Sequence, residues 1–267
     1  MNALKILMTL MLLLTISACQ KAESEQLKIK SSAIPDEPKK ATPPAHIPTI
    51  EEWNEALKST YTESDSKDGK DGTRVFYARF PDQTGTFFDA QKKSGNLSRV
   101  TRDGFRKMYF FKNIWPDTIK NLVTNVSSYI SLPDGGKPTM LLRVYFNGRN
   151  GWLFMNKVAV MLDGEVILEN DFSKEQVERN TTRPGIEETY TFIADASNIA
   201  ALRKIKPTSK VIIRITGDKG YVNVDGDGTG KSKEIDATEV FIDSIMRSLA
   251  IYDTLNMALE NHIPPKK

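Results

Sequence analysis

The sequence predicts an α+β domain in which helices pack against a mostly antiparallel β-sheet. Between Met140 and Leu168, apolar residues fall at every second position, and Asn-Gly and Asp-Gly pairs interrupt the run, as in strands joined by tight turns. Near the C-terminus, apolar residues instead recur every three or four positions from Phe241 to Leu259, which is the period of a helix. The two periods together indicate a sheet covered by a long C-terminal helix and two or three shorter helices.

The strands are expected to be short and sequential. A central meander over about 139–169 is predicted to comprise a strand at 140–146, a reversal at Asn147-Gly148 and Asn150-Gly151, a return strand at 152–162 and, after Asp163-Gly164, a third strand. Further strands are expected at 74–80, 189–194 and 210–216.

The helices are predicted from their capping signals and apolar spacing. Thr49 and Glu52 fit a capping box that begins a helix ending near Tyr61, and the polar stretch 64–72 is expected to be an exposed loop. Helices are also predicted at 116–129 and 196–205. The apolar stripe of the C-terminal helix is expected to pack across the sheet.

The composition of the chain argues against several classes of function. The 267 residues contain 37 Lys or Arg and 34 Asp or Glu, a net charge of +3 that is too small for a dedicated nucleic-acid-binding protein. One Cys and two His disfavour a Cys-rich zinc site or a His-based metal centre. The chain also lacks G-x-S-x-G, H-E-x-x-H and S-x-x-K motif sets. We therefore expect a protein that is not an enzyme.

The N-terminus has the pattern of a secretory signal, with Lys5 before an apolar run from Ile6 to Ile16. Ile16-Ser17-Ala18-Cys19 then resembles the lipobox of bacterial lipoproteins. The resemblance implies removal of residues 1–18 and a Cys19 that carries diacylglycerol and an N-acyl chain such as palmitate. Three chains would anchor the protein stably to a membrane.

The sequence suggests three segments: a signal peptide at 1–18, a lipidated Cys and Pro-, Lys- and Glu-rich tether at 19–47, and one globular α+β domain at 48–267. Gln20, directly after the lipobox, is not the Asp associated with retention at the inner membrane. We therefore expect an outer-membrane lipoprotein whose body faces the periplasm or the cell surface.

Residues 223–234 resemble the twelve-residue calcium loop of an EF-hand. The resemblance implies calcium ligands at Asn223, Asp225, Asp227, Thr229 (through its carbonyl) and Glu234, with Gly228 allowing the sharp turn. The loop departs from the family because Asn stands first and no helix is predicted before it. The alternative is a solvated Asp- and Gly-rich turn without metal, so Ca²⁺ is a candidate cofactor only.

Basic residues, among them Lys112, are interleaved with aromatic residues over 99–115. Arg99, Arg102, Arg106 and Lys107 could form a patch for an anionic polymer, a lipid headgroup or a glycan, through charge and stacking. The alternative is an amphipathic element with its aromatic rings in the core and its cations in water.

These patterns predict a lipid-anchored protein of the cell envelope with a binding or scaffolding domain. Its expected partners are the membrane and an envelope protein or glycan, and no nucleic acid; its oligomeric state is open. The alternative function is an envelope glycan hydrolase that uses a carboxylate pair, with calcium as structural support.

Overall fold

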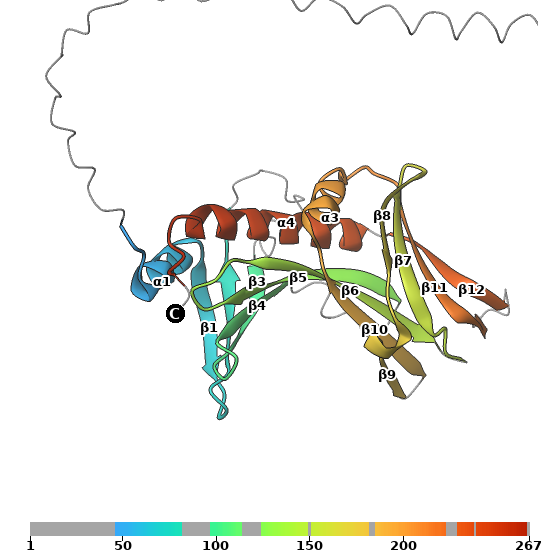
Figure 1. Ribbon diagram of the computed structural model, residues 1–267, viewed down its shortest axis with the longest axis horizontal. Coiled ribbons are helices and arrows are strands. Elements are labelled where there is room, and N and C mark those ends of the chain that lie inside the picture. Colours follow the sequence, from blue (N-terminus) through green and yellow to red (C-terminus); the bar gives the residue numbers. More distant parts are fainter. Residues whose placement is uncertain are drawn as a thin grey trace, which may run out of the picture. The chain divides into compact units, whose positions relative to one another are not determined.

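Two antiparallel β-sheets account for most of the structure, a computed structural model that describes residues 46–81, 97–113, 124–148, 151–181, 185–222, 229–237 and 239–265 (Figure 1). Sheet A has the strand order β1-β2-β3-β4-β5-β6-β10-β9, and sheet B the order β12-β11-β7-β8. The strands of sheet A are β1 (Thr62–Asp68), β2 (Arg74–Arg79), β3 (Leu97–Asp103), β4 (Met108–Asn113), β5 (Asn125–Pro133), β6 (Thr139–Gly148), β9 (Glu178–Thr181) and β10 (Ile186–Ile193). Those of sheet B are β7 (Met155–Leu162), β8 (Glu165–Asp171), β11 (Val211–Val222) and β12 (Thr229–Asp236).

The described residues form three α-helices, α1 (Ile50–Ser59), α3 (Ala196–Leu202) and α4 (Glu239–Leu259), and one 3₁₀ turn, η2 (Lys174–Gln176). The fold is thus mostly β and broadly α+β, as predicted. None of these helices combines the length and the apolar character that crossing a membrane requires.

The predicted first helix is confirmed in detail. Thr49 caps α1 by accepting a hydrogen bond from the Glu52 amide at 3.2 Å, and the Glu52 carboxylate accepts one from the Thr49 amide at 2.8 Å. This reciprocal pair satisfies two N–H groups that would otherwise lack partners at the start of the helix. The predicted helix at 196–205 is α3, and Asp195 caps it through the Asn198 amide.

The C-terminal helix is also confirmed, and it packs across sheet A against β4, β5 and β6 (Figure 1). Ile245, Leu255 and Leu259, which belong to the predicted apolar stripe, are completely buried. Residues of α1, α4 and both sheets share one hydrophobic core. Residues 46–267 make up one compact unit.

The predicted central meander is wrong at one step. β7 and β8 pair as expected, but β6 pairs with β5 and β10 and belongs to a different sheet from β7. Because β5 and β10 occupy both edges of β6, no edge is left for β7. The chain instead crosses from sheet A to sheet B just before Met155. At this crossing the backbones of Gly217 and Leu153 lie very close together, since a Cβ added to Gly217 would be 2.2 Å from the carbonyl oxygen of Leu153.

Two local predictions also need correction. The expected loop at 64–72 contains most of β1, which pairs with β2 although all its side chains are exposed. Backbone pairing with β2 holds this strand at the edge of the sheet. Its sequence therefore shows no alternation of apolar and polar residues. Residues 125–129 of the predicted helix 116–129 are strand β5, because they pair with β4 and β6 on both sides; residues 116–123 lie outside the described part.

The two faces of sheet A differ. On the core face, a row of buried apolar residues runs directly across five strands and packs toward the helices. This row consists of Phe76, Val100, Phe111, Ile130 and Met140. In Figure 1, α1 and α4 lie on this side of β3 to β6, and no α-helix that the structure describes lies on the opposite side. We call that opposite side the open face.

Candidate functional site

The structure divides the predicted anionic-ligand patch between two faces and a turn. Arg99 lies on β3 with its side chain exposed on the open face, whereas Arg102 lies on the core-face side of the same strand. Arg106 and Lys107 belong to the exposed turn between β3 and β4. The four residues that the sequence grouped together therefore do not form one site.

Arg102 already has partners within the fold. Its Nη2 donates a hydrogen bond to Asp134 Oδ2 at 2.9 Å, and its guanidinium carbon lies 5.4 Å from the ring centroid of Tyr109. Arg106 in turn pairs with Asp103, with 3.7 Å between Nε and Oδ2. These contacts give Arg102 and Arg106 structural roles and leave Arg99 as the member of the patch that faces the open side.

The open face is built from three parallel rows of directly opposed residues. The first row contains Tyr77, Arg99, Lys112, Tyr129, Leu141 and Ile193. The second contains Ser127, Arg143 and Thr191, and the third Asn125, Tyr145, Thr189 and Glu178. Because directly opposed residues on a sheet project to the same side, these side chains point to one face of the sheet. Within these rows Tyr145 and Ser127 are themselves buried.

Cations and aromatic rings alternate on this surface. Lys112 Nζ lies 5.8 Å from the ring centroid of Tyr129, and the guanidinium carbon of Arg143 lies 5.5 Å from that of Tyr145. Arg99 stands directly opposite Lys112 on the neighbouring strand. Like charges in directly opposed positions on a sheet repel each other.

The electrostatics agree with that geometry. Burial lowers the pKa of Lys112, and the nearby charges of Arg143 and Arg99 lower it further. Within the part of the chain that the structure describes, neither Lys112 nor Arg143 forms an ion pair with a carboxylate. Two half-buried cations thus lie near each other with aromatic surface beside them. Of this residue set, the sequence indicated Arg99 and Lys112, but not Arg143 or the rings of Tyr129 and Tyr145.

The other end of the open face is acidic. Glu178 is exposed on β9, and Tyr145 is hydrogen-bonded to Glu187. Burial, followed by that hydrogen bond, raises the pKa of Tyr145 to about 12. Burial also raises the pKa of Tyr129, against the lowering effects of its hydrogen bond to Thr191 and of the Arg143 charge, while the Glu178 charge raises it. The Tyr129 hydroxyl therefore lies within electrostatic reach of both a cation and a carboxylate.

Polar groups on the core face are satisfied by the fold. The Asn113 side chain donates to Ser244 O at 2.9 Å and to Ser248 Oγ at 3.0 Å, while Ser128 Oγ donates to Ser248 Oγ at 2.7 Å. These bonds tie β4 and β5 to α4. All four residues are buried, so this cluster fixes the position of the helix and does not present a site to a ligand.

Glu188 is the second polar feature of the core face, and it is completely buried. Its two carboxylate oxygens accept hydrogen bonds from the amides of Phe154 (2.8 Å) and Met155 (2.9 Å), and Arg179 Nε lies 3.5 Å away. Phe154 has a φ of 52°, a conformation that bulky residues rarely adopt. Glu188 therefore holds the backbone where the chain passes from sheet A to sheet B.

The predicted calcium ligands are only partly within the described residues. Thr229 and Glu234 are the first and sixth residues of β12, so their Cα atoms are about 17 Å apart along the strand. Glu234 Oε1 accepts a hydrogen bond from Arg214 Nε at 2.8 Å. The structure thus does not bring these two residues together. Asn223, Asp225 and Asp227 lie outside the described residues, and calcium binding stays a prediction, as does the lipidation of Cys19, which also lies outside them.

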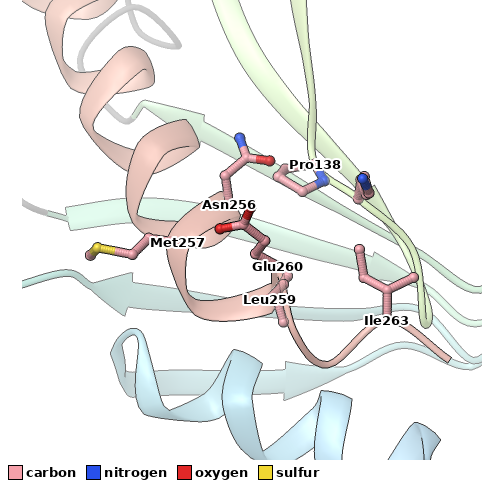
Figure 2. A pocket seen from close by; sticks show the side chains of 7 residues that line it. Pro138, Asn256, Met257, Leu259, Glu260 and Ile263 are labelled. Carbon is pink, nitrogen blue, oxygen red and sulfur yellow. The ribbon is translucent and has the colours of Figure 1, made fainter. Parts of the chain in front are cut away.

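A small pocket of about 190 Å³ lies where the end of α4 meets the turn between β5 and β6 (Figure 2). It is lined by Lys137, Pro138, Asn256, Met257, Leu259, Glu260 and Ile263. Its volume is below the 300–1,000 Å³ or so that is usual for ligand pockets. We therefore place the candidate site on the open face.

Across the described residues, no group of three or more His, Cys, Asp or Glu side chains is arranged to hold a metal ion. Comparison of the chain with protein-family models, with curated proteins and with solved structures found no match.

Proposed function

We propose that this protein is a lipid-anchored protein of the bacterial cell envelope, residing at the outer membrane, whose body binds an anionic ligand on the open face without catalysing a reaction. The observation that carries the binding role is the pair formed by Lys112 and Arg143. Both cations are half-buried, both lie over tyrosine rings, and the described residues provide no carboxylate for either. Partly desolvated cations beside aromatic rings suit an anion that also offers surface for stacking.

The anchor is proposed from the sequence. The Cys19 sulfur at the end of the lipobox would carry the diacylglycerol, and the Pro-rich stretch before α1 would connect it to the body. Replacing Cys19 by Ser is expected to abolish incorporation of radiolabelled fatty acid and retention in the membrane fraction. The matched variant Ser24→Ala should be labelled like the wild type. Normal labelling of the Cys19→Ser chain would refute the anchor.

The binding role is tested with inorganic phosphate as the probe. The full chain in nonionic detergent micelles is titrated calorimetrically, and Lys112→Met is compared with Lys206→Met, which removes an exposed lysine of the loop after α3. We expect Lys112→Met to weaken phosphate binding about tenfold, the value of one charge-assisted hydrogen bond. Lys206→Met should bind like the wild type. Equal binding by all three chains would remove the open face as the anion site.

A further inference from the structure

We propose that the ligand of the open face is a zwitterionic phospholipid headgroup, with its phosphate at Lys112 and Arg143 and its ammonium group at Glu178. This inference rests on the proposed function, because the same face is taken to hold the anion. It adds the second charge of the ligand and its apolar tail.

The first argument is the position of Thr189 between the two charges. Arg143 Nη2 lies 3.5 Å from Thr189 Oγ1, and Thr189 stands directly opposite Glu178 on β9. One strand, β10, separates β6 from β9, so their backbones are about 10 Å apart. Arg143 and Glu178 are therefore near each other on one surface.

The second argument is that these opposite charges do not meet. Among the described residues, Glu178 makes no ion pair, and the Arg143 guanidinium contacts Thr189 Oγ1 and the Tyr145 ring but no carboxylate. In the order of the strands, Arg143 on β6 lies between Tyr129 on β5 and Glu178 on β9, and the charges of both Arg143 and Glu178 act on the pKa of Tyr129. A ligand with a phosphate and an ammonium a few ångströms apart would bridge them, satisfying the guanidinium with one group and the carboxylate with the other.

The third argument concerns the tail. Ile193 is 63% exposed and stands directly opposite Leu141, which is half-buried, in the same row as Tyr129 and Lys112. An exposed large apolar side chain beside a charged site is suited to an amphiphile, because the tail can cover it while the headgroup meets the charges. A soluble zwitterion without a tail would leave Ile193 in water.

The test compares headgroup fragments on the full chain in nonionic detergent micelles. We expect O-phosphoethanolamine to bind about tenfold more tightly than inorganic phosphate, since the ammonium adds one charge-assisted contact, and ethanolamine alone to bind weakly. Glu178→Gln should bring O-phosphoethanolamine down to the level of phosphate without weakening phosphate itself. Glu165→Gln, which removes an exposed carboxylate of β8, is the matched control and should behave like the wild type.

The tail is tested by titrating lysophosphatidylethanolamine into the same micelles. Ile193→Ser is expected to weaken binding of this lysolipid severalfold while leaving O-phosphoethanolamine unchanged. Equal lysolipid binding by Ile193→Ser and wild type would overturn the lipid source.

The outcomes separate the two proposals. Phosphate and O-phosphoethanolamine binding equally well, or Glu178→Gln changing nothing, would overturn the zwitterion and leave the anion site standing. Failure of both compounds to bind would overturn the anion site and, with it, the inference. Because Glu178 and Ile193 are exposed, loss of folding is not the expected cause of any change, and thermal unfolding of each variant checks this.

Discussion

On the core face of sheet A, Glu188 is completely buried and each of its carboxylate oxygens accepts a backbone hydrogen bond. On the open face of the same sheet, Lys112 and Arg143 are only half-buried, yet the described residues offer them no carboxylate. A buried charge that the fold satisfies maintains the structure. Cations that lose part of their hydration without an ion-pair partner among the described residues are available to a ligand. We therefore assign a structural role to the core face and a binding role to the open face.

The largest expected effect is that of Glu188→Ala on the core face. This change leaves the amides of Phe154 and Met155 without their acceptor and removes the charge facing Arg179. We expect the free energy of unfolding to fall by about 3–5 kcal/mol, as when one partner of a buried ion pair is removed. Urea unfolding measures it, with Glu165→Ala on the exposed side of β8 as control. A loss below about 1 kcal/mol would mean that Glu188 does not hold the junction between the sheets.

Asn113→Ala should have a smaller effect. Asn113 is the donor that links β4 to Ser244 and Ser248 of α4, and its loss leaves the Ser244 carbonyl short of one bond. The expected decrease in the free energy of unfolding is about 1–3 kcal/mol. Hydrogen exchange should show the added opening in α4, and unchanged protection there would contradict the role of Asn113 in placing the helix.

Lys112→Met on the open face should change stability little, by less than about 0.5 kcal/mol or in the stabilising direction, since it removes a desolvated charge opposite Arg99. The same change should weaken phosphate binding about tenfold. A loss of stability above about 2 kcal/mol would show that Lys112 is part of the structural framework and would remove the contrast between the faces.

The smallest effect is a pH dependence. Burial and neighbouring cations hold the pKa of Lys112 below the ordinary 10.5 of a lysine. Between its folded pKa and 10.5 the unfolded chain binds more protons at this site, so stability contributed by Lys112 rises with pH. The free energy of unfolding of the wild type should therefore increase relative to that of Lys112→Met as pH rises toward 10.5. A constant difference would contradict the lowered pKa.

Local signals were sufficient for the elements that local contacts hold. The Thr49–Glu52 capping box and the apolar stripe of α4 are complete within one helix each, and both were predicted. β1 was not, because its side chains are all exposed and only its pairing with β2 defines it. β6 and β7 belong to different sheets because the distant strand β10 pairs with β6. No turn motif in the sequence indicates that pairing.

The candidate site could be predicted only at Arg99 and Lys112, for the same reason. Lys112 and Arg143 lie two strands apart on one face because β5 lies between β4 and β6, and the sequence interpretation placed part of β5 in a helix. Spacing along the chain grouped Arg99 with Arg102, whereas the alternation of a strand sends neighbouring cations to opposite faces. A patch on a sheet is defined by register between strands, which one sequence does not reveal.

The most direct test of the account is the chemical reactivity of Lys112. The full chain in micelles is acetylated briefly with and without inorganic phosphate, and the modification of each lysine is read by mass spectrometry. We predict that phosphate slows acetylation of Lys112 and leaves Lys206 unaffected. Equal modification of Lys112 in both conditions, at phosphate concentrations that saturate calorimetric binding, would contradict the claim that the open face holds the anion.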